Sequence, residues 1–262
     1  MQRITEPELM DEAEQARAYA MADFAEPNER FVGYFETEFP DLQTGSVLDL
    51  GCGPGDIVLR LATRRAGLTV HGIDGSAAML RFASESLHES PELGGRVQFI
   101  EGLLPGATLP LPAYDAVVSN SLLHHLHDPD VFWRAVREAG APGAAVLVMD
   151  LFRPESAAAA QAIVDQYAAG EPDVLRQDFF ASLCAAFEPD EIRAQLRALL
   201  GSRVLAKQIG HRVADILEQH EGDEGHREHH DDGLREAAED EGEHVLSAPT
   251  EQAPCRGDLQ FT

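Results

Sequence analysis

The sequence predicts an α/β protein with a doubly wound, mostly parallel sheet, and three observations carry this prediction. Five apolar runs alternate with segments of helical periodicity between about residues 41 and 152. The runs are continuously apolar, as in strands that helices cover on both faces. The first run passes directly into a glycine-rich loop that opens a helix, Gly51-Cys52-Gly53-Pro54-Gly55. In open α/β sheets, loops at the carboxyl ends of strands contact ligands.

Composition limits the class of protein. The chain has 262 residues, a hydrophobic fraction of 44% and a formal net charge of -26. This length supports one well-buried domain with additions, and the negative charge argues against nucleic acid, which is bound through Lys and Arg clusters. The three isolated cysteines indicate a reducing compartment. Without a signal-peptide pattern or an apolar run of about 20 residues, we expect a cytoplasmic protein that does not enter membranes. The oligomeric state stays open.

The glycine loop itself discriminates between ligands. A dinucleotide fingerprint requires Gly-x-Gly-x-x-Gly, but Asp56 stands where the third glycine belongs. A phosphate-binding P-loop ends in Gly-Lys-Ser/Thr, whereas Asp56 and Ile57 follow Gly55, and Pro54 removes one backbone donor. What remains is Asp49, two places before the first glycine, and then Gly-x-Gly-x-Gly. Two carboxylates beside such a loop suit a cationic ligand better than a pyrophosphate.

The next units place polar residues at the ends of strands. Thr69–Asp74 predicts a second strand that ends in an acid, followed by a helix over Ala77–Leu87. A carboxylate in this position binds ribose hydroxyls in doubly wound nucleotide folds. The alternative is a helix cap, for which Ser76 is the better residue. Third and fourth strands are predicted over Val97–Gly102 and Tyr114–Asn120.

Three histidines follow the fourth strand, at positions 124, 125 and 127. Imidazole is a common metal ligand, but no Cys or carboxylate pair completes a set at ligand spacing. The adjacent rings of His124 and His125 are also expected to leave the chain in different directions, so we expect no metal site. Asp128 predicts the N-cap and Pro129 the first position of a helix that continues over Asp130–Ala139.

The remaining elements are less regular. Helices are predicted over 8–21 and 28–38 ahead of the core, a fifth strand over 143–151, and helices over 154–169, 171–186 and 189–200. Residues 203–209 predict a sixth strand, and we expect no strand directly after it. Residues 218–262 are acidic, rich in histidine and poor in large apolar groups, which predicts a largely disordered tail.

Two segments resemble signature motifs of one enzyme family. Asp49 with the loop Gly51–Gly55 resembles motif I of the class I S-adenosylmethionine-dependent methyltransferases. Leu123–Pro129 resembles the Leu-His-His-Leu-x-Asp-Pro segment of their small-molecule members. The resemblance implies a Rossmann-like core over 41–152, a helical lid over 1–40, and a helical insertion with the last strand over 153–217. It also implies a closing hairpin of strands, which we expect to be degenerate in this chain.

The resemblance further implies which residues bind S-adenosylmethionine. The ribose hydroxyls are assigned to Asp74. Leu103 stands where many members carry an acid for the adenine amino group, so backbone amides around Leu103 and Leu104 are expected to contact the adenine. The expected cofactor-binding set is Asp49, Gly51, Gly53, Gly55, Asp74, Gly75, Leu103, Leu104 and Asn120.

The same resemblance suggests the catalytic and lid residues. His124 is expected to face the cofactor or acceptor and to act as general base where the acceptor starts protonated, whereas His125 is as readily a packed structural residue. Lid contacts are expected among Tyr19, Phe24, Glu29, Arg30 and Phe31. The alternative is that Phe24, Phe31 and Phe35 only dock the helices as an apolar stripe.

These interpretations together predict methyl transfer to a small-molecule acceptor by in-line displacement. One alternative is a non-catalytic S-adenosylmethionine-binding regulator or partner protein. Another is an NAD(P)-dependent oxidoreductase on the same topology, which Asp56 disfavours. The sequence does not name the acceptor or the atom that is methylated.

Overall fold

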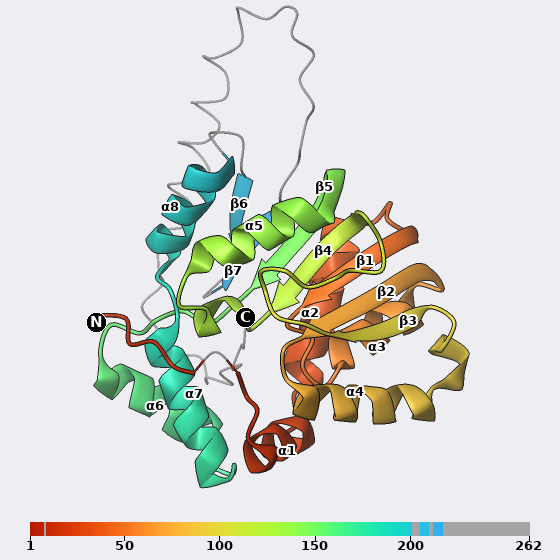
Figure 1. Cartoon of the computed structure of the whole chain (residues 1–262). Helices are drawn as coiled ribbons and strands as arrows, with labels where there is room; N and C mark the ends of the chain where they lie inside the picture. The colour runs from red at the N-terminus through yellow and green to blue at the C-terminus, as the bar shows by residue number, and fades with distance from the viewer. Residues whose placement is uncertain (8, 201–204, 210–211, 217–262) are drawn as a thin grey trace, which may run out of the picture. The chain divides into compact units, whose positions relative to one another are not determined.

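The protein is described by a computed structural model that covers residues 1–7, 9–200, 205–209 and 212–216. Its centre is a sheet of five parallel strands in the order β3-β2-β1-β4-β5 (Figure 1). The strands are β1 (Thr44–Leu50), β2 (Gly67–Asp74), β3 (Val97–Glu101), β4 (Tyr114–Asn120) and β5 (Gly140–Met149). The predicted doubly wound α/β fold is therefore confirmed.

The strand order reverses between β1 and β4. From β1 the chain builds outward through β2 to β3, and it then returns to pair β4 against the other side of β1. Crevices at such a reversal, outside the carboxyl ends of the strands, are where open α/β sheets bind ligands. The glycine loop after β1, Asp74 at the end of β2 and Asn120 at the end of β4 all lie at this edge.

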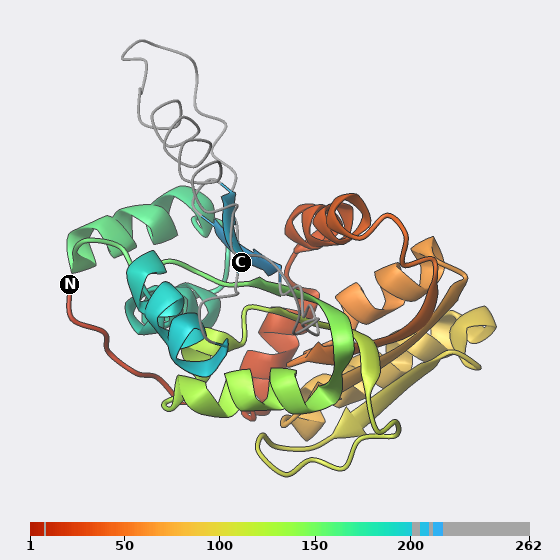
Figure 2. The same cartoon turned by 90° about the horizontal axis from the view of Figure 1, so that it is seen from above.

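Helices cover both faces of the sheet, as the continuously apolar strands require (Figure 2). On one face, α2 (Ala25–Glu38) and α3 (Asp56–Arg64) bury Phe31, Phe35 and Leu61 in a core that also includes α4 (Ala77–Glu89). On the other face, α5 (Pro129–Ala139) and α8 (Pro189–Leu200) bury a second core with Phe132 and Trp133. Two short 3₁₀ turns, η1 (Pro91–Leu93) and η2 (Leu123–His125), complete the connections.

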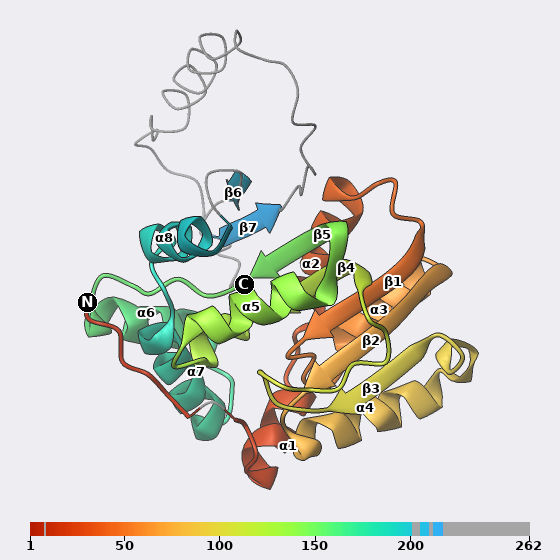
Figure 3. The same cartoon turned by 45° about the horizontal axis from the view of Figure 1, so that its top comes forward.

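A further layer lies off the carboxyl ends of the strands. The helices α6 (Ala157–Tyr167) and α7 (Asp173–Ala185) pack against each other around Val164, Phe179 and Leu183. Helix α7 also packs against α1 (Ala13–Met21) and against η2, so these helices stand side by side at one end of the sheet (Figures 1 and 3). This layer is what encloses the ligand edge.

The predicted helix starts have clear physical causes. The Ser76 hydroxyl accepts a hydrogen bond from the backbone N–H of Met79 at 3.2 Å, and Asp128 accepts one from Asp130 at 3.0 Å. Both are N-caps, and Pro129 occupies the first turn of α5, as predicted. The first helix begins at residue 13 and not at residue 8, because the carbonyl of Met10 instead accepts a hydrogen bond from the Ser76 hydroxyl at 2.9 Å.

The expectation that no strand follows the sixth was wrong. Strand β6 (Leu205–Ile209) pairs antiparallel with β7 (Arg212–Ile216), which gives a two-stranded hairpin. The sequence Arg-Val-Ala-Asp-Ile places two apolar residues side by side between its two charged residues, so it lacks the period-2 alternation that would predict a strand. The predicted tail over 218–262 lies outside the described residues.

Within the described part of the chain, none of the helices has the length and apolar character needed to cross a membrane.

Candidate active site

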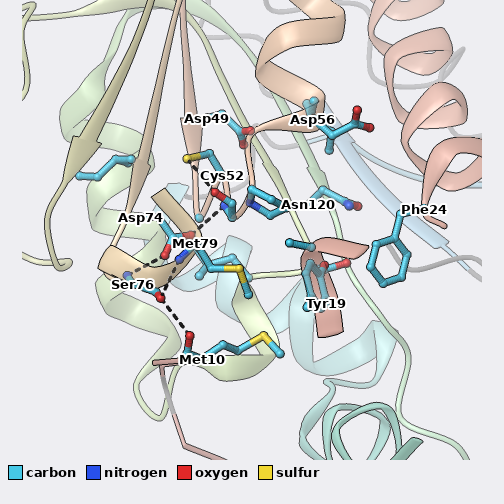
Figure 4. Close-up of a pocket in the computed structure, with 18 of the residues that line it drawn as sticks. Met10, Tyr19, Phe24, Asp49, Cys52, Asp56, Asp74, Ser76, Met79 and Asn120 are labelled. Carbon is cyan, nitrogen blue, oxygen red and sulfur yellow. Dashed lines mark hydrogen bonds between the residues drawn. The ribbon is translucent and has the colours of Figure 1, made fainter. Parts of the chain in front are cut away.

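A cavity of about 420 Å³ lies at the carboxyl ends of β1, β2 and β4 (Figure 4). Its volume lies in the range of about 300–1,000 Å³ that small-molecule sites occupy. The glycine loop and the ends of the strands form its floor. Residues of α1, α2 and the segment before α1 form its cover, so the cavity is bounded by parts of the chain that are distant in sequence.

The three loop glycines differ in what they permit. All have positive φ, at 72° for Gly51, 52° for Gly53 and 86° for Gly55, a conformation that other residues rarely adopt. A Cβ on Gly51 would lie 2.8 Å from Leu122, and one on Gly55 would lie 2.6 Å from the Phe99 ring. A Cβ on Gly53 would meet no atom within 4 Å. Gly51 and Gly55 thus permit close packing, and only Gly51 and Gly53 line the cavity.

Asp74 holds the loop in place from the end of β2. Its Oδ2 accepts a hydrogen bond from the backbone N–H of Gly53, and its Oδ1 accepts one from Ser76, both at 2.8 Å (Figure 4). Burial raises the pKa of Asp74, although these two N–H groups favour the carboxylate. The carboxylate therefore already has one partner on each oxygen and keeps its remaining lone pairs toward the cavity that it lines.

Two further polar groups on the cavity floor lack partners. The carboxyl of Asp49 is 2% exposed, and burial together with the neighbouring Asp74 raises its pKa well above the ordinary value. Among the described residues no group donates a hydrogen bond to Asp49. The Oδ1 atom of Asn120 is likewise buried without a hydrogen-bond partner. Buried acceptors are nearly always satisfied, so Asp49 and Asn120 call for a donor, and a cationic donor suits a carboxylate best.

The rest of the predicted cofactor set also lies at the cavity. Gly75, Leu103 and Leu104 all line it. A Cβ on Gly75 would lie 2.6 Å from the Leu103 side chain, so the glycine lets the β2 and β3 ends approach closely. Leu103 is 58% exposed, which is unusual for a large apolar side chain and leaves an apolar surface at the cavity mouth.

The second acid of the loop does not stay free for a ligand. Asp56 lines the cavity, but its Oδ2 accepts hydrogen bonds from Arg60 at 2.6 Å and from Asn28 at 2.8 Å. These contacts tie α3 to α2. The structure therefore leaves Asp49, and not Asp56, as the unsatisfied carboxylate of the loop.

Of the five predicted lid contacts, two reach the cavity. Tyr19 and Phe24 line it, with ring centroids 4.7 Å apart, and burial raises the pKa of Tyr19 to about 12. Phe31 is fully buried in the core, which confirms the packing alternative for that residue. The carboxylate of Glu29 pairs with Arg60 and Arg64, and Arg30 pairs with Glu26.

The histidines occupy places that differ from the prediction. His125 lines the cavity, while His124 is 2% exposed and lies behind it. The expectation that the two rings diverge was wrong, because the 3₁₀ turn η2 sets them side by side with centroids 4.2 Å apart. The third ring, that of His127, bonds the backbone carbonyl of Glu6 at 2.7 Å.

His124 is held by an acidic partner at the end of β5. Its Nδ1 forms a short hydrogen bond with Asp150, whose other oxygen accepts the His124 backbone N–H at 3.0 Å. Burial opposes the charged imidazole, but Asp150 and Glu6 outweigh it and raise the pKa of His124. Burial, reinforced by the adjacent His124, lowers the pKa of His125 well below its ordinary value. The cavity-facing ring is therefore a neutral imidazole at pH 7.

Glu6 is a residue of the site that the sequence did not reveal. Its carboxylate lies against both histidine rings, 3.2 Å from His125 Nδ1 and 3.6 Å from His124 Nε2. Arg3 brings this segment across the molecule by donating hydrogen bonds to the carbonyls of His124 and Leu126, each at 2.9 Å. These contacts join residues more than 120 positions apart, and no local pattern announces them.

Comparison with known proteins agrees with this architecture. Residues 48–146 match the family described as methyltransferase domain. An uncharacterised methyltransferase of Mycobacterium tuberculosis is 28% identical over 176 residues, which are 66% of this chain and 86% of the relative. A ubiquinone biosynthesis O-methyltransferase of Xanthomonas oryzae is 32% identical over 130 residues, 49% of this chain and 52% of the relative.

A solved structure shows the same fold. The plantazolicin methyltransferase, crystallised with a desmethylPZN analogue and SAH, superposes with a TM-score of 0.57 at 14% identity, over 74% of this chain and 72% of the other. The fold is the one seen in class I, S-adenosylmethionine-dependent methyltransferases, and the similar sequences are those of methyltransferases. The match to the methyltransferase domain family covers residues 48–146, which include β2, β3, β4, the glycine loop and the histidine turn.

Proposed function

We propose that the protein transfers a methyl group from S-adenosylmethionine, bound in the 420 Å³ cavity, to a small molecule. One observation supports the binding of S-adenosylmethionine, the methyl donor, in this cavity. Among the described residues, the buried Oδ1 atom of Asn120 has no hydrogen-bond donor, and it lies on the cavity floor together with the 2% exposed carboxyl of Asp49, beside the glycine loop. S-adenosylmethionine brings an ammonium group and an electrophilic methyl group on a sulfonium.

The residues at the cavity fit the separate parts of this cofactor. Asp49 and the Oδ1 atom of Asn120 accept from its ammonium group. Asp74, oriented by the N–H groups of Gly53 and Ser76, keeps lone pairs for the two ribose hydroxyls. The open space above Gly53 lets the ligand approach the backbone.

The adenine end of the cavity is apolar. Leu103 and Leu104 supply an apolar surface there, and the adenine is bound by stacking against it and by their backbone amides, without a side-chain acid. Binding at this end therefore depends more on burial than on charge.

The acceptor enters under the helical cover. Tyr19 and Phe24 line the cavity beneath this cover, and His125 lines it as well. These side chains displace water from the space between the methyl group and the acceptor. The work of this chain is positioning, because an aligned nucleophile about 3 Å from the methyl carbon gains several kcal/mol from orientation alone. A cover made of two short helix ends leaves room for a small acceptor and not for a folded protein.

His124 serves the acceptor end in this proposal. Asp150 fixes its ring through Nδ1, as the orienting group of a catalytic base does. Its Nε2, however, points toward Glu6 and not into the cavity, and His125 stands between it and the acceptor. His124 therefore acts on methyl transfer indirectly, through Glu6 and His125.

Labelled S-adenosylmethionine tests this function directly. The purified protein is incubated with the labelled cofactor and a fractionated small-molecule extract, and the label is followed by mass spectrometry. We expect transfer to one chemical class of small molecule. Label that reaches only proteins would overturn the small-molecule assignment, and tight cofactor binding without transfer to any fraction would favour a regulatory module.

A further inference from the structure

We propose that Glu6, His124 and His125 form a binding site for a divalent transition-metal ion beside the methyl-transfer cavity. The three side chains offer one carboxylate oxygen and two imidazole nitrogens, and their ligand atoms lie within 4.8 Å of one another. They come from the segment before α1 and from η2, which the fold brings together at the carboxyl edge of the sheet.

The distances match a coordination sphere. Zn²⁺ binds nitrogen and oxygen ligands at about 2.0–2.2 Å, so neighbouring ligand atoms in a tetrahedral site lie about 3.3–3.5 Å apart. The Oε1 atom of Glu6 lies 3.2 Å from His125 Nδ1 and 3.6 Å from His124 Nε2. All three ligand atoms lie within 4.8 Å of one another, so the two imidazole rings have to adjust their positions around a bound ion.

Two of the proposed ligand atoms are buried without a hydrogen bond. Among the residues that the structure describes, neither Glu6 Oε1 nor His125 Nδ1 has a hydrogen-bond partner. They lie close to each other, but they are not aligned for a hydrogen bond. The Glu6 side chain is only 9% exposed, so water does not satisfy it freely. Buried polar atoms without partners are rare and mark a missing donor or ion.

The groups behind the ligands are those that metal sites use. Asp150 binds His124 at Nδ1, which fixes the ring and leaves Nε2 as the ligand atom, as carboxylates do for metal-bound histidines. The Ser182 hydroxyl donates to the second oxygen of Glu6 at 3.3 Å, which leaves Oε1 for the ion.

The surrounding charge also favours a cation. Three carboxylates, those of Glu6, Asp150 and Asp178, act on this cluster, against the single guanidinium of Arg3. A set with two imidazoles and one carboxylate suits Zn²⁺, Fe²⁺ or Co²⁺, whereas Mg²⁺ and Ca²⁺ prefer oxygen ligands alone.

The position of His125 gives the ion a chemical role, and this part of the inference rests on the proposed function. His125 lines the cavity although its Nδ1 atom is buried, so we infer that an ion held by this ring takes an acceptor hydroxyl in its open coordination position when the acceptor is bound. An acceptor hydroxyl bound there loses its proton to water more readily. Its oxygen then forms the bond to the methyl carbon, while the electron pair of the broken carbon–sulfur bond stays on sulfur. The site thus selects oxygen acceptors and requires no separate base.

Calorimetric titration with Zn²⁺ tests the site, using the full-length protein after treatment with a chelator. We compare the wild type with Glu6→Gln, which preserves side-chain volume, and with His125→Asn, which keeps a polar side chain but removes the imidazole. The matched control is the triple variant His226→Ala, His229→Ala, His230→Ala, because these sequence-adjacent histidines of residues 218–262 are also potential ligands. We expect one tight equivalent in the wild type and the control, and at least a tenfold weaker one in both site variants.

Two further readouts separate the possible outcomes. Co²⁺ bound at this site should give the visible absorption of a tetrahedral nitrogen and oxygen complex, and the site variants should lack it. Circular dichroism spectra and thermal unfolding midpoints should stay close to those of the wild type in the site variants, which shows that they fold.

Tight Zn²⁺ binding that is unchanged in Glu6→Gln and His125→Asn, or that disappears only in the triple variant, would overturn the site. Zn²⁺ binding at the site without any methyl transfer would keep the metal and refute its role in the reaction. Methyl transfer that persists without bound metal would also refute the role of the metal in the reaction.

Discussion

Substituting the loop glycines one at a time tests whether they serve the ligand or the fold. Gly53→Ala places a methyl group where the structure has no atom within 4 Å, in the open space of the cavity. Gly51→Ala places it 2.8 Å from the Leu122 side chain, inside packed protein. The two residues lie two positions apart and both have positive φ. They should nevertheless respond differently.

The expected magnitudes follow from these contacts. Alanine in a left-handed backbone conformation destabilises the folded state by roughly 1–2 kcal/mol. Alanine also restricts the unfolded chain, which offsets about 0.4–1 kcal/mol of this destabilisation. Gly53→Ala should therefore destabilise the protein by about 1 kcal/mol. Gly51→Ala adds overpacking against Leu122, worth about 1–3 kcal/mol, for a total of about 2–4 kcal/mol. Cofactor affinity should fall at least tenfold in Gly53→Ala, which is about 1.4 kcal/mol.

Urea unfolding and calorimetric titration with S-adenosylhomocysteine measure the two quantities separately. Gly95→Ala is the control, because its Cβ would also meet nothing within 4 Å and its backbone needs no positive φ. It should change neither quantity by more than about 0.5 kcal/mol. The reasoning fails if Gly53→Ala binds the cofactor as the wild type does, or if it unfolds as readily as Gly51→Ala.

Three other substitutions probe the carboxylates and the histidine turn. Asp74→Ala should weaken S-adenosylhomocysteine binding by about 3 kcal/mol or more, because two charge-assisted hydrogen bonds to the ribose are lost; wild-type affinity in calorimetry would remove the ribose assignment. Burial raises the pKa of Asp49, so the folded protein holds a proton that the unfolded chain has released, and stability falls as the pH rises from the ordinary carboxyl range toward neutrality. Asp49→Asn should therefore raise the free energy of unfolding in urea at pH 7 by about 1 kcal/mol, and this gain should vanish below about pH 4. The same variant should bind the cofactor more weakly. A variant that is less stable than the wild type at pH 7 would contradict this prediction. His124→Ala should lower the turnover number at least tenfold while cofactor affinity changes less than twofold, and a normal turnover number with the true acceptor would exclude His124 from the reaction.

Sequence patterns predicted the parts of the fold that depend on local physics. Continuous apolar strands, the Ser76 and Asp128 caps and the glycine loop are all decided by residues within a few positions of each other. Strand β7 was missed because its five residues lack the alternating pattern of a strand. The part of the site proposed to bind S-adenosylmethionine was also predictable from local sequence. Asp49, Asp74 and Asn120 each stand at the carboxyl end of a predicted strand.

The acceptor end could not be predicted, because it depends on contacts between distant segments. Two histidines in sequence do not show whether a third ligand faces them, and Glu6 reaches them only through the folded chain. The direction of the rings depends on η2 being a 3₁₀ turn, which tightens the backbone after Leu122. The expectation of diverging rings followed from an extended chain, in which neighbouring side chains alternate.

The contacts of Arg3 impose an order on how the molecule is assembled. The glycine loop finds its packing partners within the first 122 residues of the chain, at Phe99 and Leu122. Arg3 instead donates to the carbonyl of Ala185, 182 positions further on, so this segment can dock only after α7 has been synthesised. The glycine loop and the segment that holds Arg3 and Glu6 therefore reach their final positions at different times during synthesis. A protease that cleaved directly after Pro7 would separate Arg3 and Glu6 from the rest of the chain and leave the glycine loop whole.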